Sequence, residues 1–257
     1  MSTILGASRP DPAAYMLRAA GGGAGRAYKQ ELIELLDVRP GQTVLDVGCG
    51  PGTDLPALAE RVGDAGTVIG VDHDPAMLAE ARLRTAHLPV TDLREGDAHA
   101  LPVAPGTANR AKIDRVLMHV ADPAGVLAQL HTATRPGALV GLVEPDWDTL
   151  AVDAEDLDTS RAFTRYTTSD VVRNATIGRS LARLAERAGF VVQTVLTTTP
   201  VFRDFEDADH MLGLGRNTQR AIEEGRIDAT RARRWFASLS EGPFYASITL
   251  VTVLCSR

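Results

Sequence analysis

The spacing of apolar residues along this chain changes repeatedly between two periods, and each change predicts a new strand or helix. Short runs of β-branched and apolar residues are typical of buried strands, whereas apolar residues three or four positions apart are typical of a helix face. The predicted strands cover 43–47, 66–72, 89–94, a more polar run that opens at residue 108, 138–143, 190–198 and 246–255. Helical spacing covers 24–37, 53–62, a stretch that begins at residue 74, 122–133, 179–188, 205–225 and 228–239.

Strands and helices that alternate in this way predict an α/β fold with a mostly parallel sheet. The run 138–143 is almost entirely apolar, as expected for a strand that helices cover on both faces. Two stretches, 149–178 and 200–242, interrupt the alternation in the second half of the chain. We therefore expect an N-terminal helical cap at 1–39 and one α/β domain at 40–257 that carries these two insertions.

Composition and charge narrow the class of protein. The chain has 257 residues, 44% of them hydrophobic and 23% charged, which is ordinary for a globular protein with one substantial core. The formal net charge is -6, whereas proteins that bind duplex nucleic acid usually carry a basic excess, so no nucleic-acid partner is expected. No apolar run approaches eighteen residues and the first residues do not resemble a secretion signal, so no membrane is expected either.

The two cysteines, Cys49 and Cys255, allow at most one disulfide bond, which favours a reducing, cytoplasmic location. Histidine and cysteine residues never cluster at the spacing of metal ligands, so no metal site is predicted. The sequence does not indicate an oligomeric state.

The segment 44–52, which reads VLDVGCGPG, carries the clearest chemical signal. A strand, a glycine turn and a helix follow one another there, and glycines let a ligand approach the backbone closely. The helix that begins near Thr53 directs free N–H groups towards that space. The glycine spacing is G-x-G-x-G, not the G-x-G-x-x-G of dinucleotide sites, and Asp46 would repel a pyrophosphate but attract a cation.

This segment resembles the first motif of the class I S-adenosylmethionine (SAM)-dependent methyltransferases. The resemblance implies a Rossmann-like three-layer sandwich, whose seven-stranded sheet is mostly parallel with an antiparallel last strand. It also implies SAM as cofactor, S-adenosylhomocysteine (SAH) as its product, and cofactor-binding roles for Asp46, Gly48, Gly50 and Gly52.

The next predicted strand tips continue the pattern. Asp72 ends the second strand, one strand-helix-strand step after Asp46, where a carboxylate can accept hydrogen bonds from both ribose hydroxyls. His73 follows it and is a candidate to flank the adenine. By resemblance, Asp97 binds the adenine amino group and the backbone of Ala98 meets a ring nitrogen.

By the same resemblance, Asp114 lies beside the methyl-donor end of the cofactor. The fourth strand departs from the family, because Ala108 and Asn109 replace an aromatic-Asp pair that often opens it. Methyl transfer needs a base only if the acceptor must first lose a proton. The candidate bases are His119, His210, Glu144 and Asp146, and we expect His119, just after the fourth strand, to be the catalytic one.

Residues 40–148 resemble the small-molecule methyltransferases of the ubiquinone/menaquinone type, and the remainder does so only by layout. The insertions are expected to form a lid over a small, partly apolar acceptor. Two other functions stay open: a non-methylating protein that binds SAM or SAH on this fold, and a nicotinamide dehydrogenase. The missing G-x-G-x-x-G and the acid inside the first strand argue against the dehydrogenase.

Overall fold

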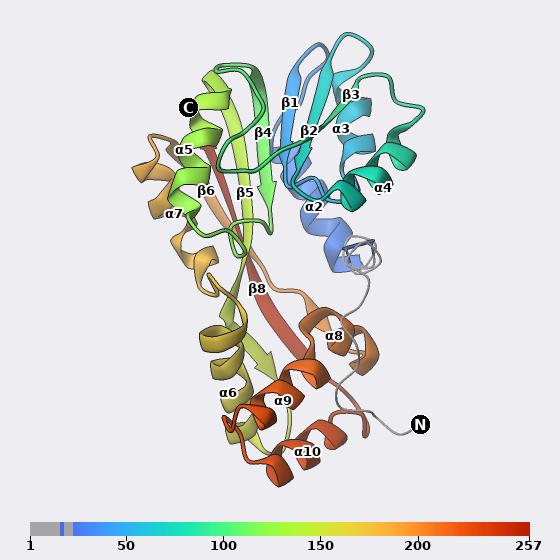
Figure 1. Ribbon diagram of the computed structural model, residues 1–257, viewed down its shortest axis with the longest axis vertical. Helices are drawn as coiled ribbons and strands as arrows, with labels where there is room; N and C mark the ends of the chain where they lie inside the picture. Colours follow the sequence, from blue (N-terminus) through green and yellow to red (C-terminus); the bar gives the residue numbers. More distant parts are fainter. Residues whose placement is uncertain (1–15, 18–22) are drawn as a thin grey trace.

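Seven strands form one continuous sheet in the order β3-β2-β1-β4-β5-β8-β6, and a two-residue strand, β7, pairs with β8 beside it. The computed structural model describes residues 16–17 and 23–257 (Figure 1). The strands are β1 (Thr43–Val47), β2 (Thr67–Asp72), β3 (Thr91–Glu95), β4 (Ala108–Asp114), β5 (Thr134–Val152), β6 (Val191–Thr198), β7 (Val201–Phe202) and β8 (Ala246–Ser256). β1 to β5 are parallel, and β8 runs antiparallel between β5 and β6.

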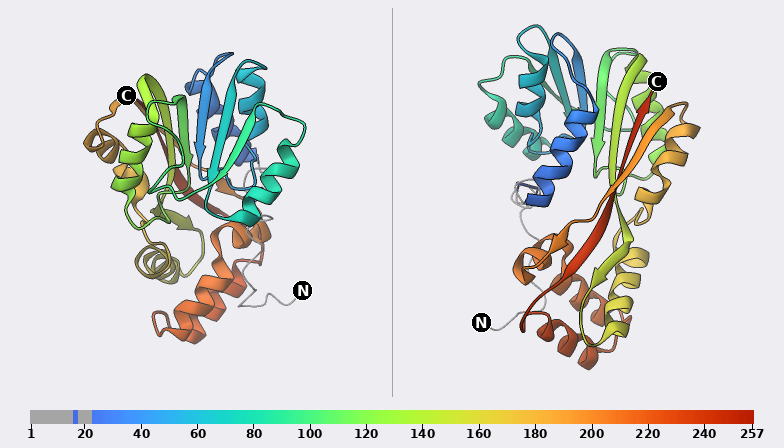
Figure 2. Two further views of the ribbon diagram at one scale, coloured as in Figure 1. Left: turned by 45° about the horizontal axis from the view of Figure 1, so that its top comes forward. Right: turned by 180° about the vertical axis from the view of Figure 1, so that it is seen from behind.

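Helices cover both faces of this sheet. One face packs against α2 (Gly23–Leu35), α3 (Leu55–Val62) and α4 (Pro75–Thr85), and the other against α5 (Pro123–Ala133) and α7 (Ile177–Arg187) (Figures 1 and 2). Each layer has a buried apolar cluster, as amphipathic helices on a two-sided sheet require. The predicted three-layer sandwich with an antiparallel last strand is therefore confirmed.

The far ends of β5 and β8 leave the main sheet and carry a second group of helices, which we call the helical lobe (Figure 1). It comprises α6 (Leu157–Tyr166), the π-helix η1 (Thr167–Val171), α8 (Phe205–Leu212), α9 (Leu214–Glu223) and α10 (Ala229–Ser238). These elements share an apolar core centred on Phe163, Trp235 and Phe236, with the ring centroids of Phe163 and Trp235 5.4 Å apart. The two predicted insertions thus fold together.

Two element boundaries differ from those predicted. The strand predicted for 138–143 belongs to β5, which runs on to Val152, beyond Pro145. Pairing of β5 with β4 ends at Asp114 and Val143, so the following proline lies where that edge is open and its missing N–H is tolerated. The helix predicted for 205–225 is two helices, because Gly213 adopts the left-handed conformation (φ 67°) that ends α8.

Helix α2 is anchored at its C-terminal half. Leu32 and Leu36 are fully buried, and Leu32 packs so closely on Gly141 of β5 that a side chain there would clash. The Arg110 guanidinium donates a hydrogen bond to the Leu36 carbonyl and holds the end of the helix. Most of the predicted N-terminal cap before α2, residues 1–15 and 18–22, lies outside the described residues.

Candidate functional site

The glycine turn at the carboxyl end of β1 has the backbone shape that its sequence predicts. Gly48, Gly50 and Gly52 all adopt positive φ, at 71°, 53° and 75°. A Cβ on Gly48 would lie 2.2 Å from Val116, and one on Gly50 would lie 2.4 Å from the methyl carbon of Met16. The positive φ angles favour glycine at all three positions, and at Gly48 the close Val116 side chain excludes a side chain as well.

Asp72 holds this turn from the adjacent strand. Its side chain is buried, and its two carboxylate oxygens accept hydrogen bonds from the backbone N–H groups of Gly50 (2.8 Å) and Asp74 (3.0 Å). A carboxylate oxygen has more than one lone pair, so these two contacts leave acceptor capacity at the carboxyl edge of the sheet. The position fits the predicted contact with ribose hydroxyls, which stays a prediction.

Beside the turn, a buried lysine joins two aspartates. Lys112 of β4 lies opposite Asp46 of β1 in the parallel register, and its Nζ is 3.0 Å from the Asp46 carboxylate. The same ammonium is 2.7 Å from the carboxylate of Asp54, the residue that precedes α3. Asp46 and Lys112 are at most 2% exposed, so bulk water solvates neither charge and each depends on its charged partners.

A second lysine extends this chain of charges. Lys29 of α2 places its Nζ 2.8 Å from Asp54 and 2.6 Å from Asp114, at the end of β4. The Tyr28 hydroxyl lies 3.2 Å from both oxygens of the Asp114 carboxylate. We call the five ionised side chains the ion network; in order of contact they are Asp46, Lys112, Asp54, Lys29 and Asp114.

Burial and mutual attraction set the charges in the network. Burial raises the pKa of Asp46 to about 6, although Lys112 opposes this. Burial would also raise the pKa of Asp54, but the two lysines outweigh it and hold that pKa well below its usual range. Asp46 and Asp54 in turn keep the pKa of Lys112 above its ordinary value against burial. The network is therefore ionised at neutral pH.

The predicted adenine side is more open. The Asp97 carboxylate is exposed and accepts hydrogen bonds from the backbone N–H (2.9 Å) and ring Nδ1 (2.7 Å) of His99. The His73 ring is 86% exposed, 3.5 Å from the Asp72 carboxylate, and Ala98 is half-buried. All three follow the tips of β2 and β3, so the fold brings the predicted cofactor residues to one edge of the sheet.

Two side chains hold the loop that follows β4. The buried Glu144 carboxylate accepts hydrogen bonds from three consecutive backbone N–H groups, at residues 116 to 118. The Asn174 side-chain amide donates to the carbonyls of Leu117 (2.7 Å) and Val120 (2.8 Å). The loop begins at Arg115 in the left-handed conformation (φ 58°) and carries His119, which is exposed.

These contacts sort the four candidate bases. Glu144 is occupied by the three N–H groups, and burial raises its pKa to about 8. The Asp146 carboxylate accepts two hydrogen bonds from the Arg179 guanidinium. One comes from Nε, and the other comes from Nη2, which lies 2.8 Å from Oδ1. His210 lies on α8 in the helical lobe. His119 lies on the loop that follows β4, and its predicted role as base stays a prediction.

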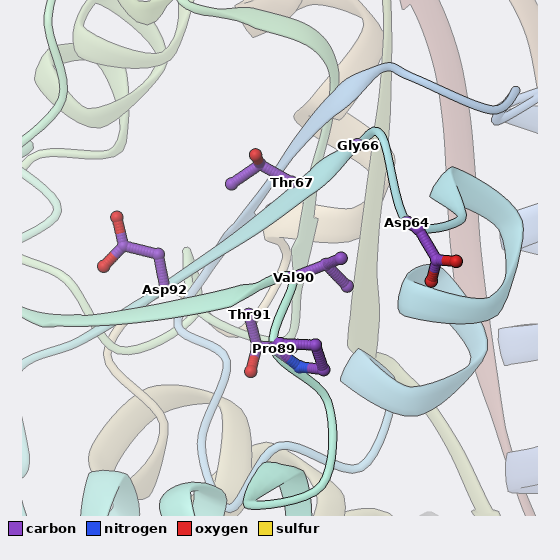
Figure 3. A pocket seen from close by; sticks show the side chains of 7 residues that line it. All are labelled: Asp64, Gly66, Thr67, Pro89, Val90, Thr91 and Asp92. Carbon is purple, nitrogen blue, oxygen red and sulfur yellow. The ribbon is translucent and has the colours of Figure 1, made fainter.

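A cavity of about 10 Å³ lies among the residues of the glycine turn and the ion network, enough for a single water molecule. Met16, Lys29 and Arg115 close it. A larger hollow, of about 310 Å³, lies at the opposite, amino end of β2 and β3 (Figure 3). Ligands of open α/β sheets bind at the carboxyl ends of the strands, so the smaller cavity marks the candidate site.

Sequence reasoning missed Lys29 and Lys112. A lysine inside a predicted central strand is a signal that could have been used, since such a charge must be paired. No similar signal distinguishes Lys29, which sits in an ordinary amphipathic helix. In the described part of the chain, no group of three or more His, Cys, Asp and Glu side chains is arranged to hold a metal ion.

Comparison with known proteins decides the family. Residues 39–198, more than half of the chain, match the family described as Methyltransferase domain. The chain belongs to this methyltransferase family. The family predicted from the sequence, the class I SAM-dependent methyltransferases, is therefore confirmed, and so is SAM as the cofactor.

Two curated relatives illustrate the match. An uncharacterised 37.1 kDa protein in transposon TN4556 of Streptomyces fradiae is 49% identical over 245 residues, 95% of this chain and 71% of the relative. The 2-phytyl-1,4-naphtoquinone methyltransferase of Thermosynechococcus vestitus is 35% identical over 122 residues, 48% of this chain. The chain spans about half, 54%, of the length of that quinone methyltransferase.

Solved structures share the fold at low sequence identity. A Bacillus halodurans protein assigned as a methyltransferase superposes with a TM-score of 0.66 at 17% identity, over 90% of this chain and 98% of that one. The (4+2)-cyclase SpnF superposes with a TM-score of 0.54 at 16% identity, over 88% of this methyltransferase-family chain and 80% of the cyclase.

Proposed function

We propose that this protein transfers the methyl group of SAM to a small, partly apolar acceptor molecule by in-line displacement. The observation that carries the proposal is the cavity between the glycine turn and the ion network, at the carboxyl edge of the sheet. The amino-acid end of SAM carries one ammonium and one carboxylate. The ion network offers carboxylates to the ammonium and lysine ammonium groups to the carboxylate.

The site residues fit this cofactor. Asp72 would bind the ribose hydroxyls while its present hydrogen bonds keep the turn in shape. Asp97, Ala98 and His73 would border the adenine, and Asp114 the methyl-donor end. Asp46, predicted from the motif to bind the cofactor, would act through Lys112, which its carboxylate contacts beside the turn. SAM itself supplies an activated methyl group, so the protein mainly has to align the acceptor.

The helical lobe is the proposed lid and acceptor-binding part. It is carried on the far ends of β5 and β8 and is held together by its own apolar core, so it can fold as a unit beside the sheet. The curated quinone methyltransferases support the same class of acceptor, although the match to them extends over only about half of this chain. Demethylated naphthoquinols are therefore the first acceptors to test, and no nucleic-acid or membrane partner is proposed.

We further propose His119 as the base that accepts a proton from a hydroxyl acceptor. It is exposed on the loop after β4, and that loop is fixed by Glu144 and Asn174. An ordinary histidine side chain has a pKa of about 6.5, so its neutral form can accept a proton at physiological pH. A His119→Asn variant should bind SAM like the wild type and lose turnover; normal turnover would remove His119 from this role.

The test of the proposed function is transfer of a radioactive methyl group from SAM. Purified protein is incubated with labelled SAM and a panel of small quinols, phenols and amines, and labelled product is extracted into organic solvent. Label in one extracted product, reduced in an Asp72→Ala variant at a SAM concentration that does not saturate the variant, supports the proposal. Tight SAM binding without transfer to any member of the panel favours the second candidate function.

That second candidate is a protein that binds SAM or SAH without transferring the methyl group. The observation in its favour is the fold shared with the cyclase SpnF.

Among the described residues, no helix has the length and apolar character of a membrane span. A cytoplasmic location, predicted from the cysteine content, stays a prediction, and the oligomeric state is open.

A further inference from the structure

Lys29 occupies the centre of the cofactor site. Its ammonium group bridges Asp54 and Asp114, whose side chains are 7% and 5% exposed. Three carboxylates (Asp46, Asp54 and Asp114) face three cations there, since the Nε of Arg115 lies 3.4 Å from Asp114. The charges around the cavity thus balance only while Lys29 stays in place.

Among the residues that the structure describes, the cavity beside these charges is too small for the amino-acid end of a cofactor. The cavity has room for about one water molecule, and the methyl group of Met16 fills the notch above Gly50. A ligand that reaches the turn must therefore displace side chains. Helix α2 cannot move away easily as a whole, because Leu32 and Leu36 are fully buried in the sheet layer.

The side chains that can give way are the flexible ones. Met16 has an unbranched side chain, and Lys29 has four rotatable methylene groups that carry its ammonium. Moving Lys29 out, however, leaves Asp54 and Asp114 as buried carboxylates with one cation fewer, which is strongly unfavourable. Only another cation in the same place restores the balance.

We propose that Lys29 is a specificity-determining residue, whose ammonium fills the place between Asp54 and Asp114 that the α-ammonium of the cofactor takes on binding. The inference rests on the proposed use of this site for SAM. In the exchange, the ligand's ammonium contacts the two aspartates and its carboxylate becomes the new partner of the displaced Lys29. A ligand that lacks a cation cannot make the exchange.

A series of three matched ligands tests this directly by calorimetry. SAH carries an ammonium and a carboxylate, S-adenosyl-3-thiopropylamine carries the ammonium alone, and 5′-methylthioadenosine carries neither. All three share the adenosine and a neutral thioether. For the wild type we expect SAH to bind tightest and methylthioadenosine at least about 100-fold more weakly, with the amine between them.

The Lys29→Met variant should reverse part of this order. Because no lysine has to be displaced, the amine analogue should bind about 10-fold more tightly than to the wild type. SAH should lose its advantage over the amine, since its carboxylate has lost its partner, and methylthioadenosine should be unchanged. An Arg110→Met variant is the control, because it removes a cation that contacts the end of α2 far from the cavity.

Three results would overturn the proposal. If Lys29→Met weakens SAH but leaves the amine unchanged, Lys29 binds only the carboxylate and no exchange occurs. If all three ligands weaken equally, Lys29 supports only the fold. If methylthioadenosine binds the wild type as tightly as SAH, the cation requirement is absent, and this last result decides even where the variant does not fold. Failure of all ligands to bind the wild type would instead contradict the cofactor assignment itself.

Discussion

The cofactor edge of the sheet and the helical lobe bury polar groups in opposite ways. At the cofactor edge, Asp46, Asp54, Lys112 and Asp114 are buried and each has charged partners at hydrogen-bond distance. In the lobe, the hydroxyls of Thr167 and Thr218 and the amide oxygen of Asn217 are buried without a hydrogen-bond partner. At the cofactor edge the buried charges are paired with one another, although the buried Nε of Arg115 pairs with Asp114 at 3.4 Å without a hydrogen bond, whereas in the lobe the unpartnered groups are neutral hydroxyls and an amide oxygen.

The contrast also bears on specificity. A network in which each charge holds its neighbour tolerates few substitutions, as a site for one fixed cofactor requires. A lobe held mainly by apolar contacts can change its lining residues at little expense to the fold. If the helical lobe binds the acceptor as proposed, acceptor choice can change in the lobe while the ion network stays the same.

The largest expected effect comes from the lysine shared by two aspartates. Lys112→Met should destabilise the protein by about 3–5 kcal/mol, because it leaves Asp46 and Asp54 buried without their common cation. Urea unfolding followed by circular dichroism measures this. The double variant Lys112→Met with Asp46→Asn should recover part of the loss; a Lys112→Met protein as stable as the wild type would show that the network is not held by charge.

The second effect is a pH dependence that belongs to Glu144. Burial raises its pKa from 4.5 to about 8, so the folded chain binds this proton more tightly than the unfolded chain. Its contribution to the free energy of unfolding is therefore largest below pH 4.5 and is lost as the pH rises towards 8.

We would measure the unfolding free energies of the wild type and of Glu144→Gln between pH 5 and 8. Their difference gives the contribution of Glu144 protonation to stability. The wild type should lose about 2–4 kcal/mol relative to the variant across that range. The exposed Glu241→Gln is the matched control and should follow the wild type. Parallel curves for wild type and Glu144→Gln would mean that Glu144 is already ionised throughout.

A third effect concerns the turn. Asp72→Ala should weaken SAM binding by about 1–3 kcal/mol, through lost charge-assisted hydrogen bonds to the ribose and a loosened Gly50. Calorimetric titration measures it. An affinity equal to that of the wild type would exclude Asp72 from ribose binding.

The smallest effect compares two fully buried threonines. Thr218 in the lobe has an unpartnered hydroxyl, whereas the Thr134 hydroxyl lies 3.0 Å from the Leu130 carbonyl at the start of β5. Thr218→Val should stabilise the protein by about 1 kcal/mol, and Thr134→Val should destabilise it by a similar amount. If thermal melts show that both variants are destabilised by the same amount, the Thr218 hydroxyl has a hydrogen-bond partner in the folded protein.

The sequence predicted the fold well where local patterns determine it. The strand, glycine turn and helix at 43–62 and the acid at the end of β2 lie where the motif indicates. Prediction was less successful where contacts between distant segments decide. The opposition of Asp46 and Lys112 depends on the register of β1 and β4, which lie 66 residues apart at that pair.

Two further features depend on contacts between distant segments. β5 continues past Pro145 because β8 still pairs with it beyond the point where β4 ends. The packing of Phe163 on Trp235, which joins 149–178 to 200–242 in the helical lobe, likewise depends on contacts that no local pattern predicts. The roles of individual site residues, and of the lobe as a lid, stay predictions, since the cofactor's contacts depend on side-chain exchange as well as on position.

The central claim is that the glycine turn and the ion network form a SAM site. Its most direct test is calorimetric titration of ligand-free protein with SAM and with SAH. The account predicts one site per chain for each, with micromolar affinity that falls in Asp72→Ala. Absence of binding by a folded wild-type protein would contradict it, and would assign the glycine turn a structural role alone.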